Sequence, residues 1–220
     1  MQLLLLSFIP YLIISIIHLY ACYYQKLSLR FKTKPFLLLT LIVTYFLISP
    51  HNEPLVIAAM LTSFLGDVLL IFKKVFWFGV VSFWISDWLY TCKLYTLLQT
   101  YKLIEQNKMI VSLILIYLFM YVMIPYKSLF NSLGKLKALG FIFGLPLITN
   151  NMLALVNVML NGINIANVMM FIGTMFYMVS DYTLIRGLFK SKINHESFYI
   201  MGTYILAQGG LVYGIIAKGL

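Results

Sequence analysis

The sequence predicts an all-α integral membrane protein, a single domain over residues 1–220 with eight transmembrane helices. Three observations support this fold class. The chain is 62% hydrophobic and has a mean hydropathy of +0.96. Only 10% of its residues are charged, whereas a soluble domain carries about 25%. Brief connections join its apolar runs, and they leave no room for a soluble domain.

Eight apolar runs come close to the roughly 20 residues that a helix needs to cross a bilayer. The first lacks a basic segment and a small-residue cleavage site, so we interpret it as a span rather than a signal peptide. The second is short and begins at Pro35, directly after a basic stretch. The sixth contains Pro146, which is expected to kink its helix. The predicted spans are 3–24, 35–50, 54–72, 75–97, 109–126, 138–160, 164–186 and 197–217.

The basic residues give the chain a direction across the membrane. Twelve of the 16 Lys and Arg residues fall in the first, third, fifth and seventh connections. Because Lys and Arg concentrate in cytoplasmic loops, these connections are predicted to be cytoplasmic and both termini to face outward. The twelve are Lys26, Arg30, Lys32, Lys34, Lys73, Lys74, Lys127, Lys135, Lys137, Arg186, Lys190 and Lys192, and the other four are Lys93, Lys102, Lys108 and Lys218.

Three of the six acidic residues, Asp67, Asp87 and Asp181, lie inside predicted spans. An ionised carboxylate in hydrocarbon is energetically costly, so such residues indicate chemistry or transport. Asp67 lies five residues before Phe72, where its span ends, and Asp181 lies five before Arg186. At 1.5 Å per residue, both carboxyl groups are predicted roughly 7–8 Å inside the cytoplasmic end. Asp87 lies 12 residues into its span, nearer the midplane.

The neighbours of these carboxyl groups predict that they face the interior of the bundle, because small residues favour close helix contacts in membranes. The segment Gly66-Asp67-Val-Leu-Leu70-Ile71 also resembles Ser180-Asp181-Tyr-Thr-Leu184-Ile185, four helices later and in the same direction. This match fits a parallel 4+4 duplication, about 1–107 and 108–220. The inward faces carry Ala59, Ser63 and Asp67; Gly173, Tyr177 and Asp181; Tyr204 and Gln208; and Asp87, Tyr90 and Thr91.

Four short motifs resemble those of the lysoplasmalogenase family, the YhhN-like integral membrane proteins. Lys34-Pro35 is similar to the Lys-Pro opening of a helix, and Ser63-Phe-Leu-Gly66-Asp67-Val-Leu-Leu70 to S-x-x-G-D-x-x-L. Phe78-Gly79 with Phe83 and Tyr90 is similar to G-x-x-x-F…A-H-x-x-Y. Ser180-Asp181-Tyr-Thr-Leu184 with Tyr204 and Ala207-Gln208 is similar to S-D-x-x-L…Y-x-x-A-Q.

The chain departs from this pattern at one place. Where the family usually has Ala-His, this sequence has Ser86-Asp87. If the family histidine relays a proton, either Asp87 takes its place or the activity differs. His18, near the cytoplasmic end of the first span, is another candidate to replace it in space.

The resemblance implies hydrolysis of the vinyl-ether bond of lysoplasmalogens, which gives a fatty aldehyde and glycerophosphocholine or glycerophosphoethanolamine. Protonation of the vinyl-ether β-carbon forms an oxocarbenium ion that water attacks. Two buried carboxyl groups in one site can supply the acid and the carboxylate, because desolvation and like charge disfavour ionising both. Asp67 and Asp181 are therefore the predicted catalytic pair. The predicted substrate-binding residues are Lys34, at the phosphate, and Asp87, Tyr90, Tyr204 and Gln208.

Two other functions stay open at this point. Intramembrane carboxyl groups also serve proton-coupled transporters, although only Asp87 lies at the depth typical of them. The departure at Asp87 also fits a relative that binds lipid without catalysis. No cofactor or metal is expected, since the sequence has no metal-ligand cluster or phosphate-binding glycine loop.

The partners follow from the same observations. The net charge of +10 is interpreted as cytoplasmic lysines beside anionic lipid, rather than as nucleic-acid binding. A lysophospholipid substrate and membrane lipids are the expected partners. The expected location is a bacterial cytoplasmic (inner) membrane.

Overall fold

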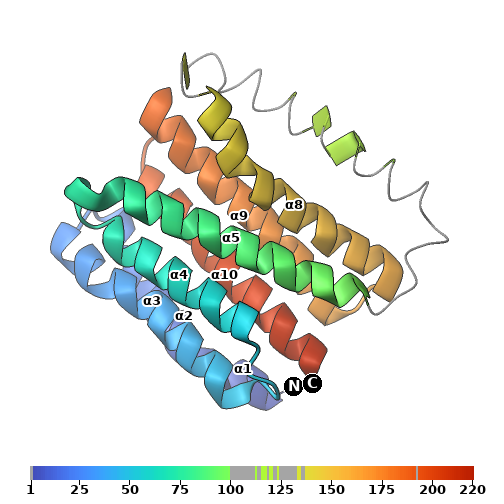
Figure 1. Ribbon diagram of the computed structural model, residues 1–220. Helices are drawn as coiled ribbons and strands as arrows, with labels where there is room; N and C mark the ends of the chain where they lie inside the picture. The colour runs from blue at the N-terminus through green and yellow to red at the C-terminus, as the bar shows by residue number, and fades with distance from the viewer. Residues whose placement is uncertain are drawn as a thin grey trace.

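The computed structural model describes residues 2–99, 137–191 and 193–220, with residues 112, 115–117, 119, 120, 123, 133 and 134. These residues form α-helices and one 3-10 turn, and no strand occurs among them, so the predicted all-α class is confirmed. The helices are α1 (Gln2–Ser7), α2 (Ile9–Tyr23), α3 (Leu27–Ile48), α4 (Pro54–Leu69), α5 (Phe76–Gln99), α8 (Lys137–Asn161), α9 (Ile165–Phe189) and α10 (Glu196–Gly219), with the 3-10 turn η1 (Lys73–Val75) (Figure 1).

Seven of the eight predicted spans coincide with described helices, and two of them differ from the prediction in detail. The first span is two helices, which break at Phe8 just before Pro10. Proline lacks an N–H and its ring clashes with the preceding turn, so α1 cannot continue through it. The second predicted span is α3, which begins at Leu27 rather than at residue 35, so Pro35 lies inside the helix. The basic residues before Pro35 kept this segment out of the apolar run, but Lys and Arg form helices readily.

Among the described residues, five helices are long and apolar enough to cross a membrane, which supports a membrane protein. They cover 27–48, 73–98, 138–161, 165–189 and 196–219. The apolar helices α2 and α4 have 15 and 16 residues, and so are about 24 Å long or less. Only seven of the 18 residues in the predicted span 109–126 are described. Eight spans, outward termini and the 4+4 duplication therefore stay predictions.

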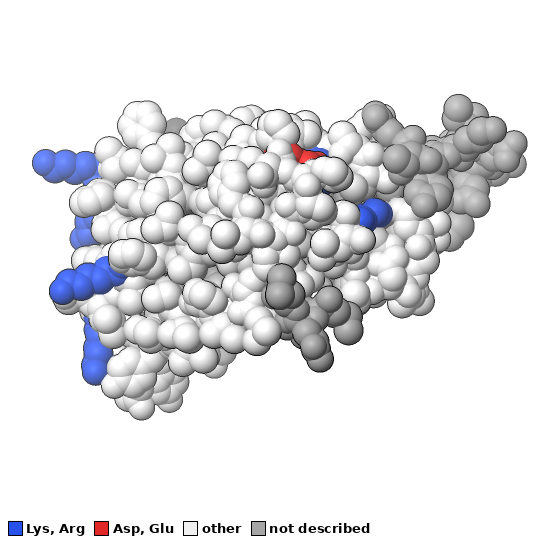
Figure 2. All heavy atoms as spheres, turned by 90° about the horizontal axis from the view of Figure 1, so that it is seen from below, with Lys and Arg blue, Asp and Glu red and all other residues white. Residues whose placement is uncertain are grey.

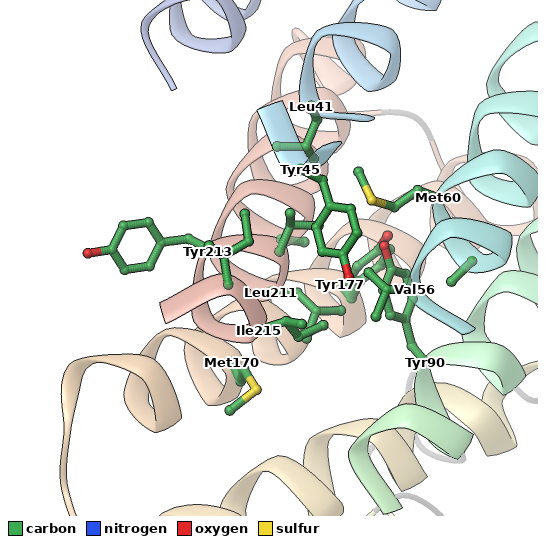
Figure 3. Close-up of a cluster of buried hydrophobic side chains, with 14 of the residues drawn as sticks. Leu41, Tyr45, Val56, Met60, Tyr90, Met170, Tyr177, Leu211, Tyr213 and Ile215 are labelled. Atoms are coloured by element: carbon green, nitrogen blue, oxygen red, sulfur yellow. The ribbon is translucent and has the colours of Figure 1, made fainter. Parts of the chain in front are cut away.

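In the described part of the chain, each long helix contacts the next, and α10 returns to α2 and α3. The result is a ring of helices in the order α2, α3, α4, α5, α8, α9, α10. Of the five candidate spans α10 is the most buried, with 61% of its apolar window inside the protein. Side chains from α3, α4, α5, α9 and α10, including Tyr45, Met60 and Tyr90, fill the interior (Figure 3).

Glycines allow α9 and α10 to pack backbone against backbone. A Cβ on Gly173 would lie only 2.7 Å from the backbone nitrogen of Leu211. A Cβ on Gly214 would lie 2.6 Å from the carbonyl oxygen of Ala166. Gly210 and Gly214 have the G-x-x-x-G spacing of close helix pairs in membranes. This contact fixes α10, and with it the polar residues of its preceding turns.

The charged side chains are distributed unevenly along the bundle. Lys and Arg gather at one end, which we call the basic end (Figure 2). There α2, α4 and α9 finish and α3, α5 and α10 begin, while both termini lie toward the opposite end (Figure 1). This is the arrangement that the predicted cytoplasmic connections require. The described residues of the basic end are Lys26, Arg30, Lys32, Lys34, Lys73, Lys74, Arg186 and Lys190.

Candidate functional site

A buried carboxyl group lies just inside the basic end. Asp67 on α4 is 1% exposed. The Lys34 Nζ on α3 lies 3.3 Å from its Oδ1, and the Tyr204 hydroxyl on α10 donates to its Oδ2 at 2.9 Å. Both carboxylate oxygens therefore have a donor, and one donor is charged. Such charge-assisted hydrogen bonds are the strong ones, so these two contacts oppose the cost of burying an ionised carboxylate.

The network continues one helical turn deeper. Ser63 precedes Asp67 by four residues and Gln208 follows Tyr204 by four, so both lie about 6 Å farther from the basic end. Gln208 Nε2 donates to Ser63 Oγ at 3.1 Å and lies 3.4 Å from the Tyr204 hydroxyl. Its Oε1 accepts a hydrogen bond from the Tyr90 hydroxyl at 3.3 Å. Gln208 thus joins α4, α5 and α10.

The hydrogen bonds at the inner end of this network have a definite direction. Ser86 donates to the carbonyl oxygen of Ala59 at 2.7 Å, and its hydroxyl has only one hydrogen. Ser63, 2.6 Å from Ser86, must therefore be the donor between the two hydroxyls. Ser63 then accepts from Gln208. Every member from Tyr90 to Ala59 has a partner, as buried polar groups require.

A second group of carboxyls lies beside this network. Asp87 on α5 is 5% exposed, and its carboxyl group is near enough to Asp181 on α9 for their charges to repel. Asp181 itself is partly exposed. The backbone carbonyl of Asp87 accepts hydrogen bonds from Thr91 at 2.9 Å and from Asn150 at 3.1 Å, which fixes this turn of α5.

Tyr177 lies between the two groups. It is 5% exposed and stands one helical turn before Asp181 on α9. Its hydroxyl lies within electrostatic reach of Asp87 and Asp181. Its ring packs edge to face on Tyr204, with the centroids 6.0 Å apart. Tyr177 is labelled in the buried interior in Figure 3.

A comparison with known families identifies the family of this chain. The model of the YhhN family matches residues 27–215, which is most of the chain. The chain belongs to the YhhN family. The match contains every residue of the network described above. No curated protein and no solved structure shows significant similarity to the chain.

In this YhhN-family protein, all seven predicted site residues lie in the described part. Five of them form one hydrogen-bonded network: Lys34, Asp67, Tyr90, Tyr204 and Gln208. Asp87 and Asp181 form the second group. Among the described residues, neither the ion pair nor the hydrogen bond of Asp67 involves Asp181. The roles predicted for these residues remain predictions.

Two members of the site, Tyr177 and Ser86, have no role predicted from the sequence. Tyr177 was placed on an inward face but given no function. Ser86 was noted only as a departure from the family motif, although it precedes Tyr90 by four residues and so shares its helix face. That spacing is the signal that could have identified it. The described residues contain no group of three or more His, Cys, Asp or Glu that could hold a metal ion.

Proposed function

We propose that this YhhN-family protein is a membrane-embedded lysoplasmalogenase. It would hydrolyse the vinyl-ether bond of a lysoplasmalogen to a fatty aldehyde and glycerophosphocholine or glycerophosphoethanolamine. The observation that carries the proposal is the buried Asp67, held by Lys34 and Tyr204 just inside the basic end. Membership of the YhhN family is compatible with this activity.

Asp67 and the group of Asp87 and Asp181 suit different roles in the reaction. Two carboxyl groups within electrostatic reach of each other, such as Asp87 and Asp181, suit a site in which one of them acts as an acid. In our proposal Asp181 is this acid and delivers its proton to the β-carbon of the vinyl ether. The positive charge that develops on the α-carbon and the ether oxygen is stabilised by the Asp67 carboxylate, whose anion Lys34 and Tyr204 hold in place.

Water completes the reaction. Asp67 accepts a proton from the water that adds to the α-carbon, and a hemiacetal forms. The hemiacetal collapses to the aldehyde as its hydroxyl proton goes to the Asp181 carboxylate, and the glycerol oxygen leaves as an alcohol with the proton that Asp67 accepted from water. One water is consumed, and the two carboxyl groups end with the proton they began with. General acid–base help of this kind contributes about 10²- to 10⁴-fold to the rate.

The depth of the site favours a lipid substrate over a small solute. The vinyl ether of a lysolipid lies a few bonds from its phosphate, and hence just inside the membrane interface. Asp67 lies within the last turn of α4, beside the basic end, where Lys34 and Arg186 could meet a phosphate. Carriers of small solutes commonly bind at the midplane instead. This contrast makes the proton-coupled transporter the weaker alternative.

Aldehyde release from a purified lysoplasmalogen tests the proposal. We expect the wild type to release aldehyde, and Asp67→Asn and Asp181→Asn to lose roughly 10²-fold or more of the rate. Glu53→Gln is the matched control, because Glu53 pairs with Lys93 and lies toward the opposite end of the bundle. Folded wild-type protein that releases no aldehyde would refute the proposal and favour a lipid-binding role. Full turnover in both Asn variants would refute the catalytic pair.

A further inference from the structure

A second buried polar group, His18 on α2, takes no part in the proposed chemistry. It is 1% exposed, and its Nδ1 lies 2.7 Å from Thr33 Oγ1 on α3. The Thr33 hydroxyl has one hydrogen, which it donates to the carbonyl oxygen of Leu29 at 2.8 Å. Nδ1 must therefore carry the hydrogen in the bond to Thr33. In the neutral ring Nε2 is then a bare acceptor.

This Nε2 is unusual in its surroundings. It is buried and has no hydrogen-bond partner among the described residues. An unsatisfied buried acceptor is costly, and most such groups in folded proteins are paired. The hydrogen bond to Thr33 holds the His18 ring in place, so Nε2 points in a fixed direction. The group is thus prepared to accept a hydrogen bond from a ligand.

The neighbours of His18 indicate what that molecule is. Arg30 and Lys34 lie within electrostatic reach of the ring. Lys34 follows Thr33 directly and binds Asp67. An ammonium has three hydrogens, so Lys34 can hold Asp67 and a phosphate oxygen together. Two cations that can bind a phosphate therefore lie on α3. The Asp67 carboxylate on α4 and the His18 acceptor on α2 are close to them.

We propose that His18 recognises the free glycerol hydroxyl of a single-chain phospholipid through an O–H···Nε2 hydrogen bond. This rests on the proposed function, whose substrate carries that hydroxyl on the carbon between the phosphate and the vinyl ether. With the phosphate at Arg30 and Lys34 and the vinyl ether at Asp67, the hydroxyl falls between them. A two-chain lipid has no hydrogen to donate there. His18 is thus a specificity-determining residue for lysolipids.

The test measures binding, so that it does not depend on turnover. Two saturated ether lipids are compared, 1-alkyl-2-hydroxy-glycerophosphocholine and its 2-O-methyl analogue, neither of which has a vinyl ether to cleave. We expect the wild type to prefer the hydroxy lipid by roughly five- to hundredfold, the range for leaving one buried acceptor unpaired. Affinities are measured in the full-length protein by calorimetry in detergent.

Two variants make the test specific. His18→Asn keeps an amide that can donate to Thr33 but has no acceptor at the Nε2 position, so the preference should fall to near unity. His18→Gln reaches that position with an amide oxygen and should keep most of the preference. Thermal unfolding in the same detergent checks that both are folded.

Three outcomes would overturn the inference: equal binding of both lipids by the wild type, an unchanged preference in folded His18→Asn, or loss of the preference in folded His18→Gln. The result also separates the two proposals. A hydroxyl preference that depends on His18, in a protein that releases no aldehyde, supports the recognition and refutes the hydrolase.

Discussion

Replacing Lys34 with methionine tests whether the Lys34–Asp67 pair behaves as a buried ion pair. Asp67 is 1% exposed, and the lysine side chain is 17% exposed. Lys34→Met removes the charged partner and leaves the carboxylate with the Tyr204 hydroxyl alone. Removing one member of a buried pair typically costs about 3–5 kcal/mol, because the other charge stays in a medium of low polarity.

A second substitution separates the charge from the shape of the lysine. In Lys34→Met/Asp67→Asn the carboxylate is gone, so methionine faces a neutral amide that Tyr204 can still bind. We expect the double variant to recover most of the loss, with a coupling free energy of about 2–3 kcal/mol between the two sites. Lys32→Met is the matched control, because Lys32 is exposed two positions earlier on α3.

Equilibrium unfolding in mixed detergent micelles provides the free energies of all four proteins. Lys32→Met should change the free energy of unfolding by less than about 0.5 kcal/mol. A cost of less than about 1 kcal/mol for Lys34→Met, with a coupling near zero, would contradict the buried ion pair. That result would mean that the pair is screened by water like a surface ion pair.

Three further predictions follow from the packing and the charge distribution. Gly173→Ala should destabilise the protein by about 1–3 kcal/mol in thermal or denaturant unfolding, because its Cβ would meet the backbone of α10. Tyr204→Phe should cost about 1.5–3 kcal/mol, since it removes a hydrogen bond to a carboxylate. With a membrane-impermeant maleimide, a cysteine-free variant carrying Ile163→Cys should react in intact cells, because residue 163 is 88% exposed at the end near the termini. Lys74→Cys, at the basic end, should react only in opened cells.

Each of these predictions has a control or a contradicting result. Gly202→Ala should be tolerated, because the nearest atom to its new Cβ, on Leu19, lies 3.8 Å away. Equal losses in the two glycine variants would argue against a close contact of α9 and α10. Tyr199→Phe should be neutral, because Tyr199 is 53% exposed. Reaction of the two cysteines in the reverse order would invert the predicted orientation.

Much of the architecture was predictable because it depends on local patterns. Apolar length and turn residues located seven described helices, mostly within a few residues of their ends. The errors have local causes as well. Pro10 divides the first span, and the basic residues before Pro35 hid the start of α3. Hydropathy detects the part of a helix inside the hydrocarbon, not the part that extends into the interface.

The sequence alone also determined that Asp67 faces inward and that Tyr204 and Gln208 share a face, because helical periodicity fixes which residues lie together. Only the tertiary structure decided which groups meet across helices. Tyr204 binds Asp67 from 137 residues away along the chain, and Asp181 lies within electrostatic reach of Asp87. The rotation of each helix and its neighbours in the ring select these partners. No spacing within one helix encodes that choice, so the roles of the carboxyls depend on packing.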